Sequence, residues 1–298
     1  IQREDIDSII ASEPDQYDFD CLIVDEAQDW PQVEAELLKA LYGPSKISLA
    51  DGIDQLVRGQ RTQWDAGVAA GEFKTIPLSQ CLRMKRNLAA FANKVANLAG
   101  INWNILPNDV AGGGRVIILR RSYFDYPQLH DELVASAKAT GNSPLDFLFV
   151  VPSTDVHAVM QKRVSDAGVA LASLGCEVWD GVDPTIRKDF PRSLNQFRVV
   201  QYASCRGLEG WTVVLQNADK YWHEQHYWRE KEGLSDTEEA AFEKIDDIAS
   251  REAWYRLLIG LTRPIDTLVI SLVDQQSECT GALLAAANEL SDFVEILD

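Results

Sequence analysis

The sequence predicts an α/β protein with parallel sheets, and two observations carry that prediction. Short apolar, β-branched segments alternate along the chain with segments of helical periodicity, the order that is typical of strand–helix–strand units. The 298 residues are 46% hydrophobic and 25% charged, which is the composition of a globular chain long enough for two domains with separate cores. We therefore expect sheets of parallel strands covered by helices.

The expected strands are the apolar runs of four or five residues that are bounded by polar or turn-forming residues. They are Cys21–Val24, Ile47–Ala50, Val116–Leu119, Phe147–Val151, Arg198–Tyr202, Thr212–Leu215 and Leu268–Leu272.

Two helices have clear start signals between these strands. One begins at Pro31, a favoured first helical position, and ends at Gly43. The other opens with Ser235 and Glu238, which have the spacing of a capping box, and continues toward Leu257. The glycines at 112–114 interrupt any regular element just before a strand. We therefore expect a boundary there, with one domain at 1–111 and a second at 112–298.

Charge and cysteine content exclude several classes of protein. The formal charge of −18 gives the chain no overall basic surface for nucleic acid, so such a partner needs a local cationic patch. The five cysteines are scattered, and none forms a C-x-x-C pair, which argues against a disulfide framework or a zinc site. No apolar run is long enough for a membrane span and no signal segment opens the chain. We expect a cytoplasmic protein with no membrane partner, and the start at Ile1 suggests a piece of a longer one.

The segment LIVDEAQDW at 22–30 places acids directly after an expected strand. Ligands of parallel α/β sheets sit beyond the carboxyl ends of the strands, where Asp25 and Glu26 fall. One carboxylate there can hold Mg²⁺, and a second can orient and deprotonate a water that attacks a phosphoryl group. The alternative is that the acids only end the strand and favour the amino end of the next helix.

The string D-E-A-Q-D resembles the Walker B motif, motif II, of the UvrD/Rep-like superfamily 1 helicases. Segments that resemble motifs III, IV, V and VI of that family follow in the family's order. These are ISLADGIDQL at 47–56, LSQCLRMKRNLAAFAN at 78–93, SCRGLEGWTVVL at 204–215 and YRLLIGLTRPIDTLVI at 255–270. Each segment falls at an expected strand end or helix start, which is the context that such a motif requires.

The resemblance implies a fold and a chemistry. The fold would be two RecA-like lobes of the P-loop NTPase class with parallel sheets, the first lobe incomplete, and ATP with Mg²⁺ would bind between the lobes. Asp25 would be the Mg²⁺ ligand, Glu26 would act on the water, and Gln55 would sense the terminal phosphate. Arg83 and Arg263 would reach the γ-phosphate from different lobes, because phosphoryl transfer is catalysed largely by positioning and charge neutralisation.

Further residues are assigned by the same resemblance. Arg206, in place of the family's lysine, would bind the nucleotide together with Gly207 and Glu209. Arg58 stands near the position of an aromatic residue that stacks on a base in the family, so it is the candidate nucleic-acid contact. Residues that grip the strand in the family's motifs V and VI are replaced here, which leaves the nucleotide-binding residues better matched than the strand-binding ones.

One part of the family pattern is missing from the sequence. No G-x-x-x-x-G-K-[ST] loop occurs in the 298 residues. Two hypotheses follow. The chain is the C-terminal part of an ATP-dependent DNA helicase or translocase that moves on single-stranded or partly duplex DNA, with RNA not excluded. Alternatively, it is a non-catalytic interaction or regulatory module that has lost its ATPase and binds a protein partner.

Overall fold

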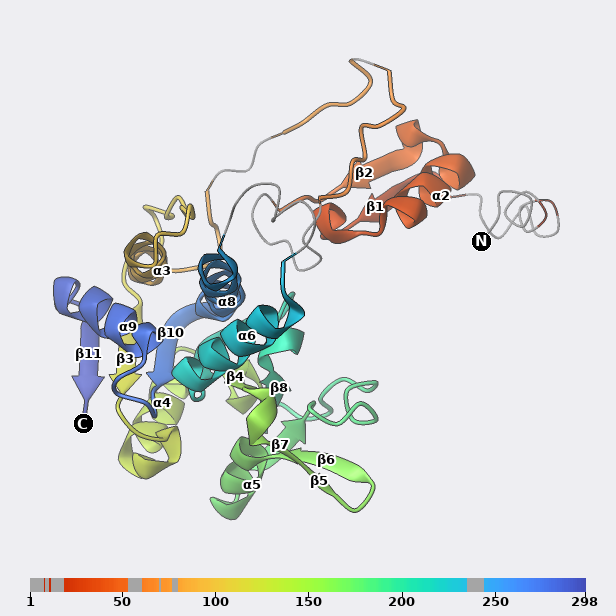
Figure 1. The fold of residues 1–298 in the computed structure, drawn as a ribbon. Coiled ribbons are helices and arrows are strands. Elements are labelled where there is room, and N and C mark those ends of the chain that lie inside the picture. Colours follow the sequence, from red (N-terminus) through yellow and green to blue (C-terminus); the bar gives the residue numbers. More distant parts are fainter. Residues whose placement is uncertain are drawn as a thin grey trace. The chain divides into compact units, whose positions relative to one another are not determined.

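The chain folds into two compact units, Ile1–Leu78 and Ser79–Asp298. The computed structural model (Figure 1) describes residues 8, 11, 19–52, 61–69, 71–76, 80–234 and 244–298. The second unit begins well before the glycines at 112–114, which corrects the expected boundary. The reason is α3 (Arg86–Leu98), whose buried Leu88 and Phe91 belong to the core of the larger sheet.

The first unit is small and is built on two parallel strands. These are β1 (Leu22–Val24) and β2 (Ile47–Leu49), with α2 (Gln32–Tyr42) between them in the chain. Val24 lies beside Leu49 in the register, so the two strands end together. Among the residues described in this unit, the core cluster consists of four buried side chains, Val24, Ala27, Ala35 and Trp64.

A seven-stranded sheet forms the centre of the second unit, and its paired strands are all parallel. The strand order is β11-β3-β10-β9-β4-β8-β7. The strands are β3 (Arg115–Leu119), β4 (Phe147–Val151), β7 (Glu177–Asp180), β8 (Gln196–Gln201), β9 (Gly210–Leu215), β10 (Pro264–Ser271) and β11 (Val294–Leu297). The expected α/β class with a parallel sheet is confirmed. Five of the seven expected strands lie in this sheet, and the other two are β1 and β2 of the first unit.

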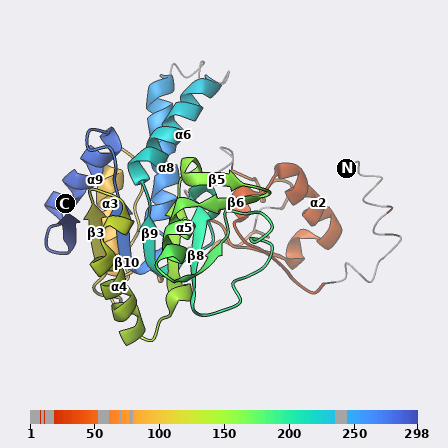
Figure 2. The same cartoon turned by 90° about the horizontal axis from the view of Figure 1, so that it is seen from below.

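Helices cover both faces of this sheet. Because successive strand residues point to opposite sides, neighbouring residues of one strand contact different helices. Ile118 packs into one cluster with α3 and three further helices, whereas its neighbour Ile117 packs into a second cluster with α4 and α5. Figure 2 shows α6 and α8 side by side on the first face. These helices are α4 (Pro127–Ala139), α5 (Asp166–Ser173), α6 (Ala218–Glu232), α8 (Ile245–Leu261) and α9 (Glu278–Glu289).

The described part of α8 begins at Ile245, and the expected start at Ser235 lies outside the described residues. Short 3₁₀ helices join several elements: Ala27–Asp29, Pro44–Lys46, Tyr123–Asp125, Pro144–Asp146, Ser153–Asp155 and Tyr202–Ser204. Among the helices that the structure describes, none is both long and apolar enough to cross a membrane.

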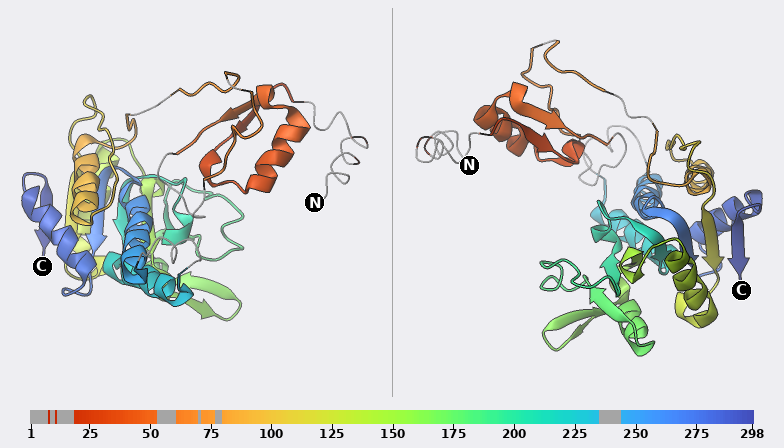
Figure 3. Two further views of the ribbon diagram at one scale, coloured as in Figure 1. Left: turned by 45° about the horizontal axis from the view of Figure 1, so that its top comes forward. Right: turned by 180° about the vertical axis from the view of Figure 1, so that it is seen from behind.

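An antiparallel hairpin of β5 (Val156–Val159) and β6 (Lys162–Ser165) stands apart from the main sheet. Both views of Figure 3 show it projecting from the second unit. Edge strand β7 follows α5, and residues 181–195 then lead into β8. This last segment is called the β7–β8 loop below.

Candidate functional site

The acids of the first unit lie where two parallel strands end. The backbone N–H of Ala27 donates to Ala50 O (2.9 Å), and that of Ala50 donates to Val24 O (2.8 Å), so Asp25 and Glu26 follow β1 beside the end of β2. Asp25 is exposed, and one of its carboxylate oxygens accepts the N–H of Glu26 (2.9 Å). This confirms the expected position of the acids at the carboxyl edge of the strands.

Glu26 has a left-handed backbone, with φ 52° and ψ 40°. A non-glycine residue in this region costs roughly 1–2 kcal/mol, and such strain persists only where surrounding contacts hold it in place. One such contact is Gln28, whose side-chain amide donates to Glu26 Oε2 (2.7 Å) and whose Oε1 accepts the N–H of Gly52 (2.8 Å). Gln28 is 1% exposed. It therefore joins the acid-bearing turn to the end of β2.

Sequence reasoning did not assign a role to Gln28. The available signal was its place inside D-E-A-Q-D, but a glutamine next to three acids gives no periodicity and no charge. Gly52 supports the assignment, because a Cβ there would meet the Gln28 amide nitrogen at 2.9 Å. A side chain at 52 would thus displace the amide that holds Glu26.

The donor set of this edge fits Mg²⁺ only as part of a nucleotide complex. Asp25 offers an exposed carboxylate, whereas Asp51 is ion-paired with Arg61. Within the described ranges, no group of three or more His, Cys, Asp or Glu residues is placed to hold a metal ion. Nucleotide-borne Mg²⁺ usually takes one or two carboxylates, with waters and phosphate oxygens as the other ligands. Gln55 and Arg58 lie outside the described residues.

In the second unit, Arg83 and Arg263 converge on one residue, Thr262. Arg83 Nη2 donates to the carbonyl oxygen of Thr262 (2.9 Å), and Arg263 Nη2 donates to its hydroxyl oxygen (3.0 Å). Arg263 Nε also donates to Ile259 O (2.8 Å) in the last turn of α8, where an arginine can satisfy a helix-end carbonyl. Arg263 is 2% exposed, and Arg83 is half-buried. The two arginines thus share a neighbourhood, and both belong to the second unit.

Glu209 completes this group at the amino end of β9. Its carboxylate lies 3.6 Å from Arg83 Nη1, and the N–H of the next residue, Gly210, donates to Arg263 O (3.2 Å). Arg198 Nη2 donates to the carbonyl oxygen of Glu209 (2.6 Å). The pairing of β9 with β10 therefore places Glu209 and Arg263 together, although they are far apart in sequence.

Gly207 and Arg206 lie in the turn that precedes Glu209. Gly207 has φ 74°, a left-handed conformation that glycine adopts without penalty. The neighbouring Cys205 is buried, and its burial raises the pKa of the thiol to about 11, while the charge of Arg263 opposes that shift. The thiol is therefore protonated at neutral pH. The group as a whole holds the guanidinium groups of Arg83, Arg198 and Arg263 at one edge of the sheet, with Arg263 buried and Arg83 half-buried. Guanidinium groups are suited to bind phosphate oxygens.

Comparison with solved structures finds similar chains, whereas the other two comparisons with known proteins find none. No protein-family model matches the sequence, and no curated protein matches it. Among solved structures, the chain is similar to the C-terminal domain of a possible DNA helicase from Lactobacillus plantarum WCFS1, with a TM-score of 0.38 and 11% identity over 72% of this chain and 98% of that chain. At that identity and TM-score, the likeness assigns neither a family nor an activity.

Proposed function

We propose that this chain is the motif II to VI portion of an ATP-dependent, superfamily 1-like helicase or translocase that acts on single-stranded DNA. The observation that carries the proposal is the convergence of Arg83, Glu209 and Arg263 at the amino ends of β9 and β10. The sequence separates these residues widely, yet the fold brings together the arginines that the motifs single out. Phosphoryl transfer needs such cationic groups near the transferred phosphate.

The proposed roles follow from what each side chain can do. Asp25 would hold Mg²⁺ together with phosphate oxygens. Glu26, fixed in its strained turn by Gln28, would accept a proton from the attacking water. Arg83 and Arg263 would stabilise charge that develops on the phosphate, and Glu209 would accept a hydrogen bond from a nucleotide hydroxyl group. When bound, Mg²⁺ supplies charge neutralisation between phosphate oxygens.

A second candidate is a helicase-like module without ATPase activity that binds a protein partner. Arg263 favours it, because that side chain is almost fully buried and donates to Ile259 and Thr262. The sequence of 298 residues also contains no phosphate-binding loop. Both hypotheses accommodate the fold, so the nucleotide chemistry decides between them.

The deciding experiment begins with the protein expressed from the natural start of its reading frame. The helicase or translocase is supported if that reading frame encodes a G-K-T or G-K-S loop after a strand and if the protein releases phosphate from Mg²⁺-ATP. The release should be lost in Glu26→Gln. Gln32→Ala is a suitable surface control, because Gln32 is an exposed residue of α2 that contacts Glu36 and the backbone of Gln63. The module is supported instead if no such loop is encoded and no phosphate is released.

A further inference from the structure

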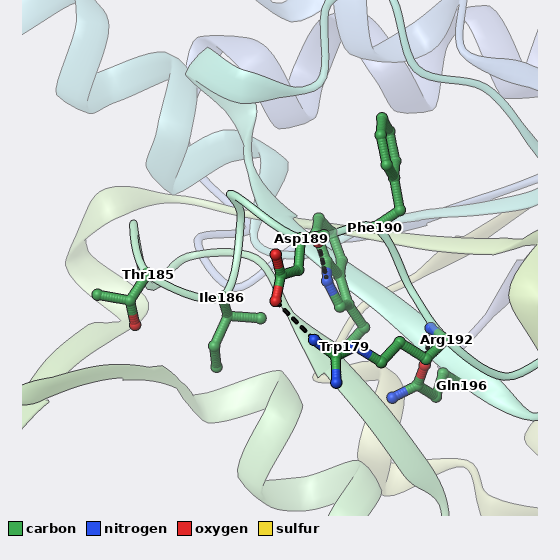
Figure 4. A pocket seen from close by; sticks show the side chains of 7 residues that line it. All are labelled: Trp179, Thr185, Ile186, Asp189, Phe190, Arg192 and Gln196. Carbon is green, nitrogen blue, oxygen red and sulfur yellow. Dashed lines mark hydrogen bonds and ion pairs between the residues drawn. The ribbon is translucent and has the colours of Figure 1, made fainter.

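A pocket lies at the β7–β8 edge of the seven-stranded sheet, and no residue of the arginine group just described lines it. Figure 4 shows the side chains that line it, which come from β7, the β7–β8 loop and the start of β8. They are Trp179, Thr185, Ile186, Asp189, Phe190, Arg192 and Gln196. The pocket has a volume of about 230 Å³ and is open to solvent, so it is smaller than the roughly 300–1,000 Å³ of drug-sized ligand sites.

Hydrogen bonds hold the pocket-forming part of the loop in place. Trp179 Nε1 donates to the carbonyl oxygen of Asp189 (3.0 Å), and the Asp189 carboxylate pairs with Arg192 (2.8 Å). Gln196 Oε1 accepts the backbone N–H groups of Arg192 (2.7 Å) and Ser193 (3.0 Å). The pocket is therefore a preformed feature of the loop.

The start of the loop is fixed to the β5–β6 hairpin through Asp183. One oxygen of this buried carboxylate accepts the N–H of Arg163 (2.8 Å), and the other accepts the hydroxyl and the N–H of Thr185. These hydrogen bonds lower the pKa of Asp183 to about 2, with the Thr185 hydroxyl as the largest cause. Hairpin and loop thus form one surface.

Aromatic and cationic side chains project from this surface. Phe190 is 90% exposed, and in Figure 4 its ring points away from the other lining residues. The cations of the hairpin and loop are all exposed: Lys162, Arg163, Arg187, Lys188 and Arg192. Residues 156–196 contain five Lys or Arg and five Asp or Glu, so this stretch is neutral in a chain of net charge −18.

The acids of the same stretch are largely engaged within it. Asp183 accepts hydrogen bonds from the loop and the hairpin, Asp189 pairs with Arg192, and Asp180 accepts from the N–H of Ser165 (2.8 Å). Arg187 donates to the hydroxyl of Ser204, just before the turn that carries Arg206. The other acids of the stretch are Asp166, which lies beside His157, and exposed Glu177, so Arg187 and Lys188 supply the positive charge next to Phe190.

We propose that the exposed ring of Phe190 beside the pocket, together with Arg187 and Lys188, binds one nucleotide of a single strand, with the base stacked on Phe190 and the adjacent phosphates paired with the two cations. Flat exposed aromatic rings bind unpaired bases of any sequence, because every base has a π-face. A base inside a duplex is stacked between its neighbours, so this surface selects single strands. The choice of ligand rests on the proposed function, whereas the location rests on the exposed Phe190, its neighbouring cations and the pocket beside them.

The experiment measures binding of a fluorescent 15-residue oligothymidylate to the 298-residue chain at low salt by anisotropy. Phe190→Ala is expected to weaken binding by about 5-fold to 100-fold, as for loss of one stacked base. The double change Arg187→Ala with Lys188→Ala should reduce the slope of log affinity against log salt by about 1.4, because each phosphate contact to a single strand contributes roughly 0.7.

Matched controls separate the pocket from general surface effects. Trp228→Ala removes an exposed aromatic of α6, and Lys138→Ala removes an exposed cation of α4, so both should change affinity by less than about twofold. Crosslinking of a bromodeoxyuridine oligonucleotide should label a peptide that contains Phe190. Phe190 is so exposed that its loss should leave the melting temperature unchanged.

Three outcomes would overturn the inference. They are absence of oligothymidylate binding by the chain, binding that Phe190→Ala leaves intact, and equal competition by an acidic peptide of the same charge. The last outcome would identify a protein-binding patch. The proposed function is tested separately by ATP turnover of the protein from its natural start. If DNA stimulates ATP turnover and Phe190→Ala has no effect, the proposed site at Phe190 is contradicted and the proposed helicase function is supported. If DNA crosslinks at Phe190 but no ATP turnover is found, the site is supported and the helicase function is contradicted.

Discussion

Glycine at position 26 should be more stable than alanine, the reverse of the usual order. Both Glu26→Gly and Glu26→Ala remove the carboxylate that accepts from Gln28 (2.7 Å), so that loss cancels between them. They differ in the left-handed backbone at φ 52°, which costs alanine roughly 1–2 kcal/mol and costs glycine nothing. Unfolded glycine has more backbone freedom, which offsets part of this difference. We expect Glu26→Gly to be about 1 kcal/mol more stable.

Hydrogen exchange of the Ala27 and Ala50 amides measures this difference within the first unit, because their hydrogen bonds join its two strands. A difference of 1 kcal/mol corresponds to about fivefold in protection. The control is Ala40→Gly at an exposed position of α2, where glycine should lose about 1 kcal/mol. Equal protection in the two position-26 variants, or greater protection with alanine, would refute the idea that Glu26 is held under strain.

Three further predictions concern burial and charge. Iodoacetamide at pH 8 should alkylate exposed Cys21 first and should reach Cys205 and Cys279 only after unfolding, because both are buried and the pKa of Cys205 is raised to about 11. Mass spectrometry of the labelled peptides checks this order, and early labelling of Cys205 would contradict it. Asp183 should remain ionised at about pH 3, because hydrogen bonds lower its pKa to about 2. Its stabilising effect is present above the unfolded pKa of about 3.9 and is lost as the pH falls toward 2, so an NMR midpoint near 4 would be inconsistent with the loop geometry. Leu258→Ala should destabilise the second unit by about 2–5 kcal/mol, because Leu258 is fully buried, whereas Leu174→Ala at an exposed position should stay within about 0.5 kcal/mol in urea unfolding.

Sequence patterns predicted the strands with continuous apolar runs and missed those with polar side chains, for a physical reason. Strand β4 is buried along its whole length and therefore appears as a continuous apolar run. Strand β7 lies at a sheet edge with the sequence EVWD, and β5 is exposed over three of its four residues. Such strands carry polar side chains and give no clear hydrophobic periodicity. The β7–β8 surface could not be recognised for the same reason.

The glycines at 112–114 correctly predicted a turn but wrongly predicted a domain boundary. Gly113 and Gly114 have φ 87° and 100°, so this turn does require glycine. A Cβ at Gly114 would meet the Leu88 side chain at 3.0 Å, and Asn87 N–H donates to Gly113 O (2.9 Å). The glycines thus let β3 begin against α3 within one unit. Only long-range packing, which local sequence does not encode, reveals this.

The places of several motif residues in the fold were predictable from the sequence, whereas the contacts that support them were not. The acids after β1 lie where the strand pattern placed them, and Arg83 and Arg263 meet at Thr262. The assignment of those arginines to different lobes was wrong in one respect, because both lie in the second unit. The roles of Gln28 and of Arg198 depend on hydrogen bonds between residues distant in sequence, which no motif shows.

ATP turnover tests the central claim most directly, with the protein expressed from the natural start of its reading frame and with single-stranded DNA present. The proposed function predicts that Arg83→Ala and Arg263→Ala each lower turnover by about 10³-fold or more, as for loss of an arginine that stabilises the transferring phosphate, and change nucleotide affinity far less. Arg115→Ala is the control, because the Arg115 guanidinium group pairs with Glu132 and Glu295. If no phosphate is released, or if both variants keep turnover within about threefold of the parent, a change under about 1 kcal/mol, the helicase assignment is contradicted and the non-catalytic module takes its place.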